Sequence, residues 1–264
     1  MWHWFEALIL GIIQGVTEFI PVSSSGHLIL AQNFLSGASD HLFVQFLDIG
    51  TTLALIIFFR KRIWNIIIDV FVRKNYRLAR NILLTIIPAG LIGFLFARVI
   101  ETNSFFGSPL VVSTGLFIIG VLMVLLERLP KLSYVKDGER LTMPRALTIG
   151  VAQVLALVPG MSRSGTTIIT GRLMGLKPAA AAEYSFLVSI PIMLGVILKV
   201  FISDGEYLMA HTGEIIVSNI AAFIAGILVI RFLMGYLSKH SLAVFGWYRI
   251  ALALGVIIVL LLVQ

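Results

Sequence analysis

Two polar clusters interrupt the apolar stretches of this sequence, and their residue types suit the binding and cleavage of a phosphate group. The first cluster, residues 14–27, reads Gln-Gly-Val-Thr-Glu-Phe-Ile-Pro-Val-Ser-Ser-Ser-Gly-His. Gln14 and Glu18 are four residues apart, so they share one face of a helix. Pro21 should end that helix, because proline disfavours helical geometry in the residue before it. We therefore expect a serine-rich turn that brings His27 back toward Glu18.

A carboxylate and an imidazole beside this turn suggest acid–base chemistry, although each residue alone also has a structural explanation. An ionised Glu18 in apolar surroundings is costly and needs a partner, water or a function. Its role would be structural if it only accepted a hydrogen bond from a backbone amide of the loop. A single histidine is more often structural than catalytic. The two residues together, in a serine-rich break, favour catalysis by Glu18 and His27.

The second cluster surrounds an arginine and has the features of an anion site. Residues 159–167 read Pro-Gly-Met-Ser-Arg-Ser-Gly-Thr-Thr. The guanidinium of Arg163 offers N–H donors in a planar fork that suits phosphate. Gly165 here, and Gly26 in the first cluster, each lead into a helix whose first N–H groups favour an anion. Together the clusters predict a diphosphate site, and the alternative is that Arg163 only neutralises Glu18 in a buried pair.

Composition places the chain in a membrane. Of its 264 residues, 59% are hydrophobic and 12% are charged, whereas soluble domains carry about 25% charged residues. The net charge of +7 does not indicate nucleic-acid binding, because the basic residues fall mainly in loops between apolar stretches. The absence of cysteine excludes a cysteine nucleophile and a thiolate metal site. Runs long enough to span a bilayer predict six transmembrane helices, at 43–59, 81–98, 110–127, 182–202, 215–234 and 246–263.

Two further apolar stretches, 5–35 and 146–175, are each broken by one of the polar clusters. Each half is too short to cross a bilayer, so we expect two re-entrant helix-loop-helix hairpins, which are tolerated where they are buried in protein or line a cavity. The basic loops after 43–59 and after 110–127 belong in the cytoplasm. Both termini then lie outside, hairpin 5–35 enters from the outside, and hairpin 146–175 enters from the inside.

The two halves of the chain, about 1–128 and 146–264, resemble each other and predict an inverted-topology internal repeat within a single integral membrane domain, 1–264. Gly11 and Gln14 align with Gly150 and Gln153. At the same offset Ser23, Ser25 and Gly26 align with Ser162, Ser164 and Gly165. An odd number of spans in each half inverts the second copy. Inverted repeats with paired broken helices place a shared site near the midplane.

These motifs resemble those of the undecaprenyl-diphosphatase family, also called the bacitracin-resistance protein family. The family pattern of Glu or Gln, three residues and then Glu is matched by Gln14 and Glu18. The Ser-Ser-x-Gly-His element is matched by Ser23, Ser24, Gly26 and His27. The Pro-Gly-x-Ser-Arg-Ser-x-x-Thr pattern is matched by Pro159, Gly160, Ser162, Arg163, Ser164 and Thr167. The resemblance extends over the whole length, including the order of the hydrophobic segments.

The resemblance implies an enzyme that converts undecaprenyl diphosphate, a polyprenyl diphosphate, to the monophosphate and inorganic phosphate, which recycles the lipid carrier for cell-wall synthesis. It implies a bacterial plasma membrane location, a site open to the periplasmic face, and a divalent cation, Mg²⁺ or Ca²⁺. Glu18 and Gln14 are the candidate metal residues. Gln14 stands where some members have Glu, which removes an anionic ligand and weakens any metal model with two carboxylates.

We assign catalysis to Glu18, His27, Ser24 and Arg163, and substrate binding to Gln14, Ser23, Ser25, Gly26, Ser162, Ser164, Gly165 and Thr167. Glu18 would orient His27 or hold a cation, and His27 would act as general acid or base. The nucleophile is Ser24 or an activated water, and Ser24 is favoured because it lies near the histidine in the turn. The alternative function is a polyprenyl-phosphate transporter, or flippase, because an inverted repeat also suits that class.

Other residues receive weaker assignments. Asp48 lies in an apolar run and could reach the cavity, but the sequence does not place it. Arg172 and Glu183 are expected to pair, and Tyr248 suits an interfacial aromatic belt. Several glycines allow close helix packing, either within one chain or in a homodimer: Gly115, Gly120 and Gly226.

Overall fold

The computed structural model describes residues 4–35, 40–96, 99–100, 103–129 and 135–263. The described chain is helical and, apart from an isolated bridge between Val135 and Leu176, shows no β-structure. The main helices are α1 (Trp4–Thr17), α2 (Ser24–Leu35), α3 (His41–Phe58), α4 (Arg60–Phe71), α5 (Arg77–Leu95), α7 (Pro109–Leu126), α8 (Met143–Gln153), α9 (Arg163–Leu173), α10 (Pro178–Ser203), α11 (Gly205–Ala210), α12 (Thr212–Leu237) and α13 (Ala243–Val263). Short 3₁₀ helices are η1 (Ser104–Gly107), η2 (Gly138–Arg140) and η3 (Val154–Leu157).

The apolar helices agree with a polytopic membrane protein. Helices α5, α7, α10, α12 and α13 are each long and apolar enough to cross a bilayer. Helices α3 and α4, which meet at a bend of 70°, count as a sixth candidate if they form one broken span. Five of the predicted spans correspond to the five helices and the predicted span 43–59 corresponds to α3, while the basic segment after it forms the helix α4. The prediction of an all-α polytopic membrane protein is confirmed.

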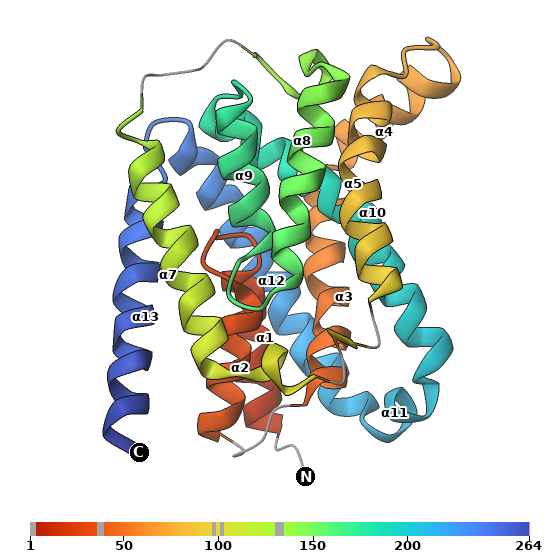
Figure 1. The fold of residues 1–264 in the computed structure, drawn as a ribbon. Helices are drawn as coiled ribbons and strands as arrows, with labels where there is room; N and C mark the ends of the chain where they lie inside the picture. Colours follow the sequence, from red (N-terminus) through yellow and green to blue (C-terminus); the bar gives the residue numbers. More distant parts are fainter. Residues whose placement is uncertain (1–3, 36–39, 97–98, 101–102, 130–134, 264) are drawn as a thin grey trace.

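The two predicted hairpins correspond to α1 with α2 and to α8, η3 and α9 (Figure 1). Figure 1 shows that α1 and α2 rise from the end of the molecule where the N-terminus lies, whereas α8 and α9 descend from the opposite end. The loops of the two hairpins meet in the middle of the bundle. The segments Trp4–Thr17 and Met143–Leu157 are apolar but shorter than a span. Their placement as re-entrant hairpins in a bilayer stays a prediction.

Each hairpin packs its first helix against a long apolar helix. Helix α1 packs against α12, and α8 packs against α5. The aligned glycines allow both contacts, since a Cβ atom on Gly11 would lie 2.1 Å from the carbonyl oxygen of Ser218. A Cβ atom on Gly150 would lie 2.7 Å from that of Thr85. A glycine thus allows a close helix contact in each half of the chain, while the inverted repeat itself stays a prediction.

Several of the weaker sequence assignments are resolved within the described residues. The expected Arg172–Glu183 pair is wrong. Arg62 lies 3.1 Å from Glu183, and Arg172 lies 4.0 Å from Glu127. Neither partner is near in sequence, so helix packing alone selects them. The three glycines expected at close contacts all meet other parts of the same chain: Gly115 faces the backbone around Gly160, Gly120 faces Gly246, and Gly226 faces Phe19.

Candidate functional site

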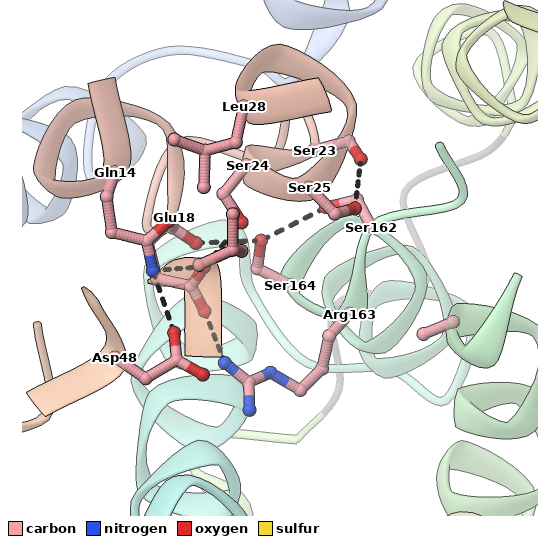
Figure 2. Close-up of a pocket in the computed structure, with 12 residues that line it drawn as sticks. Gln14, Glu18, Ser23, Ser24, Ser25, Leu28, Asp48, Ser162, Arg163 and Ser164 are labelled. Atoms are coloured by element: carbon pink, nitrogen blue, oxygen red, sulfur yellow. Dashed lines mark hydrogen bonds and ion pairs between the residues drawn. The ribbon is translucent and has the colours of Figure 1, made fainter. Parts of the chain in front are cut away.

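A pocket of about 280 Å³ lies where the two hairpin loops meet, and it brings most of the predicted site residues together (Figure 2). It is lined by Gln14, Glu18, Ser23, Ser24, Ser25, Leu28, Val44, Asp48, Ala156, Ser162, Arg163 and Ser164. Four of the predicted residues do not line it: Gly26, His27, Gly165 and Thr167. The predicted convergence of the two clusters on one cavity is therefore confirmed.

The two loops use the same local geometry to turn the chain into the pocket. Ser23 and Ser162 both have positive φ, of 76° and 67°, a region that non-glycine residues seldom adopt. Each serine side chain then accepts a hydrogen bond from a glycine N–H three residues later, Gly26 at 3.4 Å and Gly165 at 3.1 Å. Helix α2 begins at the residue after Ser23, and helix α9 begins at the residue after Ser162. Both helix N-termini therefore start at the pocket, where their dipoles favour an anion.

An ion pair between Glu18 and Arg163 joins the two hairpins across the pocket. The side chain of Glu18 is 10% exposed and that of Arg163 is 22% exposed. The other carboxylate oxygen of Glu18 accepts a short hydrogen bond from the hydroxyl of Ser24. The hydroxyl of Ser164 reaches the backbone oxygen of Glu18 at 3.4 Å. One carboxylate therefore contacts both the proposed nucleophile and the proposed phosphate-binding arginine.

Asp48 of α3 is a second carboxylate in the pocket, which the sequence could not place. The amide nitrogen of Gln14 donates to Asp48 at 2.8 Å and to Glu18 at 3.4 Å. The side-chain carbonyl oxygen of Gln14 is buried and lacks a hydrogen-bond partner among the described atoms. Asp48 thus brings to the pocket the second carboxylate that the motif lacks because position 14 is a glutamine.

His27 contacts Ser23 and Tyr248 and not Glu18, so the expected contact between His27 and Glu18 is wrong. Its Nδ1 lies 2.8 Å from the backbone oxygen of Ser23, and its Nε2 lies 2.8 Å from the hydroxyl of Tyr248. The two rings are stacked with centroids 5.7 Å apart. Tyr248 comes from α13 and supplies a partner that no local pattern indicates. The hydroxyl of Tyr248 contacts the histidine, and the place of this half-exposed tyrosine in an interfacial belt stays a prediction.

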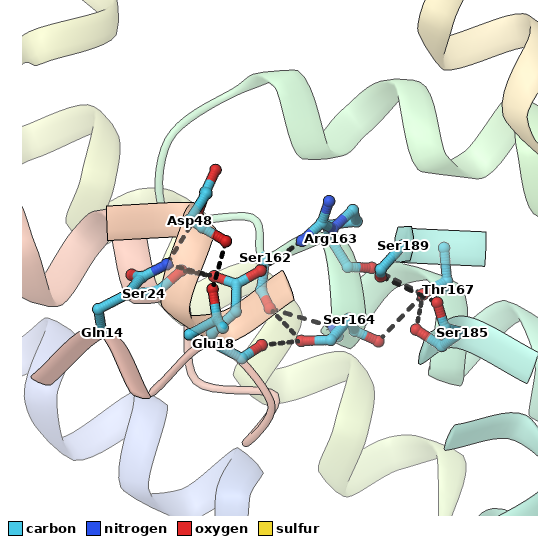
Figure 3. A network of polar contacts seen from close by, with 12 residues as sticks. Gln14, Glu18, Ser24, Asp48, Ser162, Arg163, Ser164, Thr167, Ser185 and Ser189 are labelled. Carbon is cyan, nitrogen blue, oxygen red and sulfur yellow. Dashed lines mark hydrogen bonds and ion pairs between the residues drawn. The ribbon is translucent and has the colours of Figure 1, made fainter. Parts of the chain in front are cut away.

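Thr167 and the two glycines lie behind the pocket. The hydroxyl of Thr167 donates to the backbone oxygen of Arg163 at 2.8 Å and lies 2.6 Å from the hydroxyl of Ser185 (Figure 3). A methyl group on Gly26 would meet Val112, and one on Gly165 would meet Met123. These residues can hold the shape of the site, but this geometry gives them no direct contact with a bound phosphate.

Arg249 of α13 is a buried residue that the sequence analysis missed. It is 0% exposed, and its guanidinium donates to carbonyl oxygens from both loops and from α7. Those oxygens belong to Pro21 at 3.1 Å, Gly115 at 3.3 Å, Leu116 at 3.2 Å and Gly160. The signal was a lone cation in the apolar stretch 246–263, which calls for explanation at membrane depth. Arg249 ties the first loop to the second through their backbones.

The donor atoms in the pocket fit a hard divalent cation in part. Within the ranges that the structure describes, no group of three or more His, Cys, Asp or Glu side chains is placed to hold a metal ion. Mg²⁺, however, is usually held by one or two carboxylates together with phosphate oxygens of the substrate and water. Glu18, Asp48 and the unpartnered carbonyl oxygen of Gln14 match that smaller requirement.

Comparison with known proteins places the chain among relatives of similar length. Residues 7–255 match the family model described as "Bacitracin resistance protein BacA". The chain is 40% identical to "Undecaprenyl-diphosphatase 1" of Clostridioides difficile, over 96% of this chain and 94% of that protein. It is 36% identical to "Undecaprenyl-diphosphatase 2" of Paramagnetospirillum magneticum, over 93% of this chain and 95% of that protein.

Proposed function

We propose a function for this chain, which belongs to the bacitracin resistance protein BacA family. The chain is an undecaprenyl-diphosphatase, which hydrolyses undecaprenyl diphosphate to undecaprenyl phosphate and inorganic phosphate. The names of its full-length relatives support this activity over the polyprenyl-phosphate transporter. The observation that carries the proposal is the convergence of Ser24, Glu18 and Arg163 on one pocket.

The terminal phosphate would bind between the two hairpin loops. Arg163 contacts Glu18 through one terminal nitrogen, which leaves other N–H donors of its fork for phosphate oxygens. The hydroxyls of Ser162 and Ser164 line the same wall and would donate to the remaining oxygens. The N-termini of α2 and α9 favour the same negative charge. Binding of this kind stabilises the charge on the equatorial oxygens in the transition state.

Ser24 is the nucleophile of the proposed reaction. Its hydroxyl already donates to Glu18, so Glu18 would take the proton as the serine oxygen attacks the terminal phosphorus. The bond from that phosphorus to the bridging oxygen breaks, and undecaprenyl phosphate leaves with the electron pair. Water then attacks the phosphoserine and releases inorganic phosphate, with Glu18 returning a proton to Ser24. His27 has no place in these steps, because it does not line the pocket and its ring nitrogens contact the backbone oxygen of Ser23 and the hydroxyl of Tyr248.

Other parts of the proposal follow from the family and from charge. A divalent cation such as Mg²⁺ or Ca²⁺, held by Glu18 and Gln14, would neutralise diphosphate charge when bound. The protein lies in the bacterial plasma membrane with the pocket open to the periplasmic face. In support of this, α4 and its basic residues lie at the end of the molecule opposite the N-terminus (Figure 1), which suits a cytoplasmic end. A homodimer stays a prediction.

The nucleophile is tested by trapping a phosphoenzyme. Purified protein in detergent is mixed with undecaprenyl diphosphate labelled in its terminal phosphate, and the reaction is stopped in acid, in which phosphoserine survives. We expect label on wild-type protein and on Ser24→Ala none, with phosphate release lost as well. The matched control is Ser238→Ala, which removes a hydroxyl at the exposed end of α12 and should behave as wild type. Full phosphate release by Ser24→Ala would exclude the serine mechanism and leave an activated water.

A further inference from the structure

The charge of the pocket does not suit a diphosphate unless a cation is added. The charged side chains among its described lining residues are Glu18, Asp48 and Arg163, which are two acids and one base. A diphosphate head group brings further negative charge into the same space. The negative charges of the phosphates and of the two carboxylates repel one another strongly inside a pocket that holds little water. The single guanidinium forms an ion pair with Glu18 and also attracts Asp48, so two carboxylates share one positive charge in this pocket.

We propose that Asp48 is a cation-binding residue of this site, which forms a divalent-cation subsite with Glu18 and the side-chain carbonyl oxygen of Gln14. The inference rests on the proposed function for its substrate, and it deepens that function by assigning a role to a residue outside the sequence motifs. The motif pair of Gln14 and Glu18 contains one carboxylate. Helix α3 brings the second one to the same point of the pocket.

The contacts of Gln14 locate the subsite. Its NH₂ group lies between the two acids and donates to Asp48 at 2.8 Å and to Glu18 at 3.4 Å (Figure 2). That group is the electropositive end of the amide and occupies the place where a cation would be attracted by both carboxylates. A neutral amide satisfies hydrogen bonding there but does not compensate two buried negative charges.

An unsatisfied oxygen supports the same assignment independently. Gln14 is 2% exposed, and its side-chain carbonyl oxygen has no hydrogen-bond partner among the described atoms. Buried polar atoms are nearly always paired, so this oxygen gains a partner if the amide turns it toward a cation between the two acids. Amide nitrogen and oxygen exchange places by rotation about the last side-chain bond, and the oxygen can then serve as a ligand. Two carboxylates, an amide oxygen and phosphate oxygens are the ligand types that Mg²⁺ prefers.

The first test measures cation binding without any lipid, so its outcome does not depend on the proposed activity. Mn²⁺ is titrated into the purified full-length protein in detergent and followed by electron paramagnetic resonance as a stand-in for Mg²⁺. We expect Asp48→Asn to weaken Mn²⁺ binding by about 10-fold or more, as removal of metal-site groups usually does. The matched control, Asp204→Asn, removes an acid beyond the end of α10 and should leave binding unchanged. Equal binding by wild type and Asp48→Asn would overturn the proposal.

A second variant guards against a simple loss of folding. The double variant Gln14→Glu with Asp48→Gln keeps one amide and one carboxylate in contact and exchanges their positions. We expect it to recover Mn²⁺ binding relative to Asp48→Asn, and to recover the Mg²⁺ dependence of phosphate release if the chain is the proposed phosphatase. A double variant that binds Mn²⁺ no better than Asp48→Asn would show that the paired charge is not what holds the cation, and the proposal would fail. Absence of phosphate release by wild-type protein that binds Mn²⁺ would instead count against the proposed function alone.

Discussion

Replacement of Arg249 tests whether one buried guanidinium holds the two hairpin loops in place. Arg249→Met keeps a long apolar side chain but removes every N–H donor. The carbonyl oxygens of Pro21 and Gly160, one in each loop, then lose a partner in a region where Arg249 is 0% exposed. Each unsatisfied buried acceptor costs about 1–3 kcal/mol, which gives about 2–6 kcal/mol for the two loops. Release of a buried charge offsets part of this cost, so we expect a net loss of about 2–4 kcal/mol.

The loss should appear as a lower thermal stability in detergent. For a chain of this size a change of 1 kcal/mol moves Tm by about 2–4 °C, so Arg249→Met should lower the apparent Tm by about 4–16 °C. Arg249→Lys keeps the charge but has fewer donors, so its Tm should lie between those of the wild type and Arg249→Met. Because the loops carry the pocket, kcat at a temperature where the variant stays folded should drop more than KM rises. The control is Arg231→Met, which removes an exposed arginine from α12. Equal Tm values for Arg249→Met and Arg231→Met would refute the reasoning.

Two further predictions concern the frame of the site. Gly160 has φ of +88°, and a Cβ atom there would lie 2.2 Å from the carbonyl oxygen of Val112, so Gly160→Ala should lower Tm strongly. Gly195→Ala is its control, because nothing lies within 4 Å of the new methyl group, and in a helix interior alanine should stabilise by up to about 1 kcal/mol. A Gly160→Ala protein as stable as wild type would show that the loop path is wrong. Tyr248→Phe removes the hydroxyl that lies 2.8 Å from the Nε2 atom of His27. It should lower the free energy of unfolding by about 1 kcal/mol, and the phosphoenzyme should still form. Complete loss of labelling in a folded variant would show that His27 takes part in the reaction.

Much of the architecture could be predicted because it depends on local signals. Apolar run length locates the spanning helices, and the polar breaks locate both hairpins. The pairing of Glu18 with Arg163 was also predictable, since opposite charges in apolar surroundings must find one another. The sequence placed Ser24 in the turn near His27, and the structure adds its contact with Glu18 across the short turn between α1 and α2. Each of these inferences needs only nearby residues or a single strong physical requirement.

The remaining contacts depend on how distant helices are rotated and packed. The sequence alone determined a helical membrane protein with two broken hairpins and a carboxylate, serine and arginine at their loops. Only the tertiary structure decided that His27 turns to Tyr248, that Asp48 joins the pocket from α3, and that Arg249 binds both loops. A hydrogen bond requires two atoms to lie about 3 Å apart. Hydropathy and spacing place helices in order but do not set their rotation that finely, so partners far apart in the chain emerge only from packing.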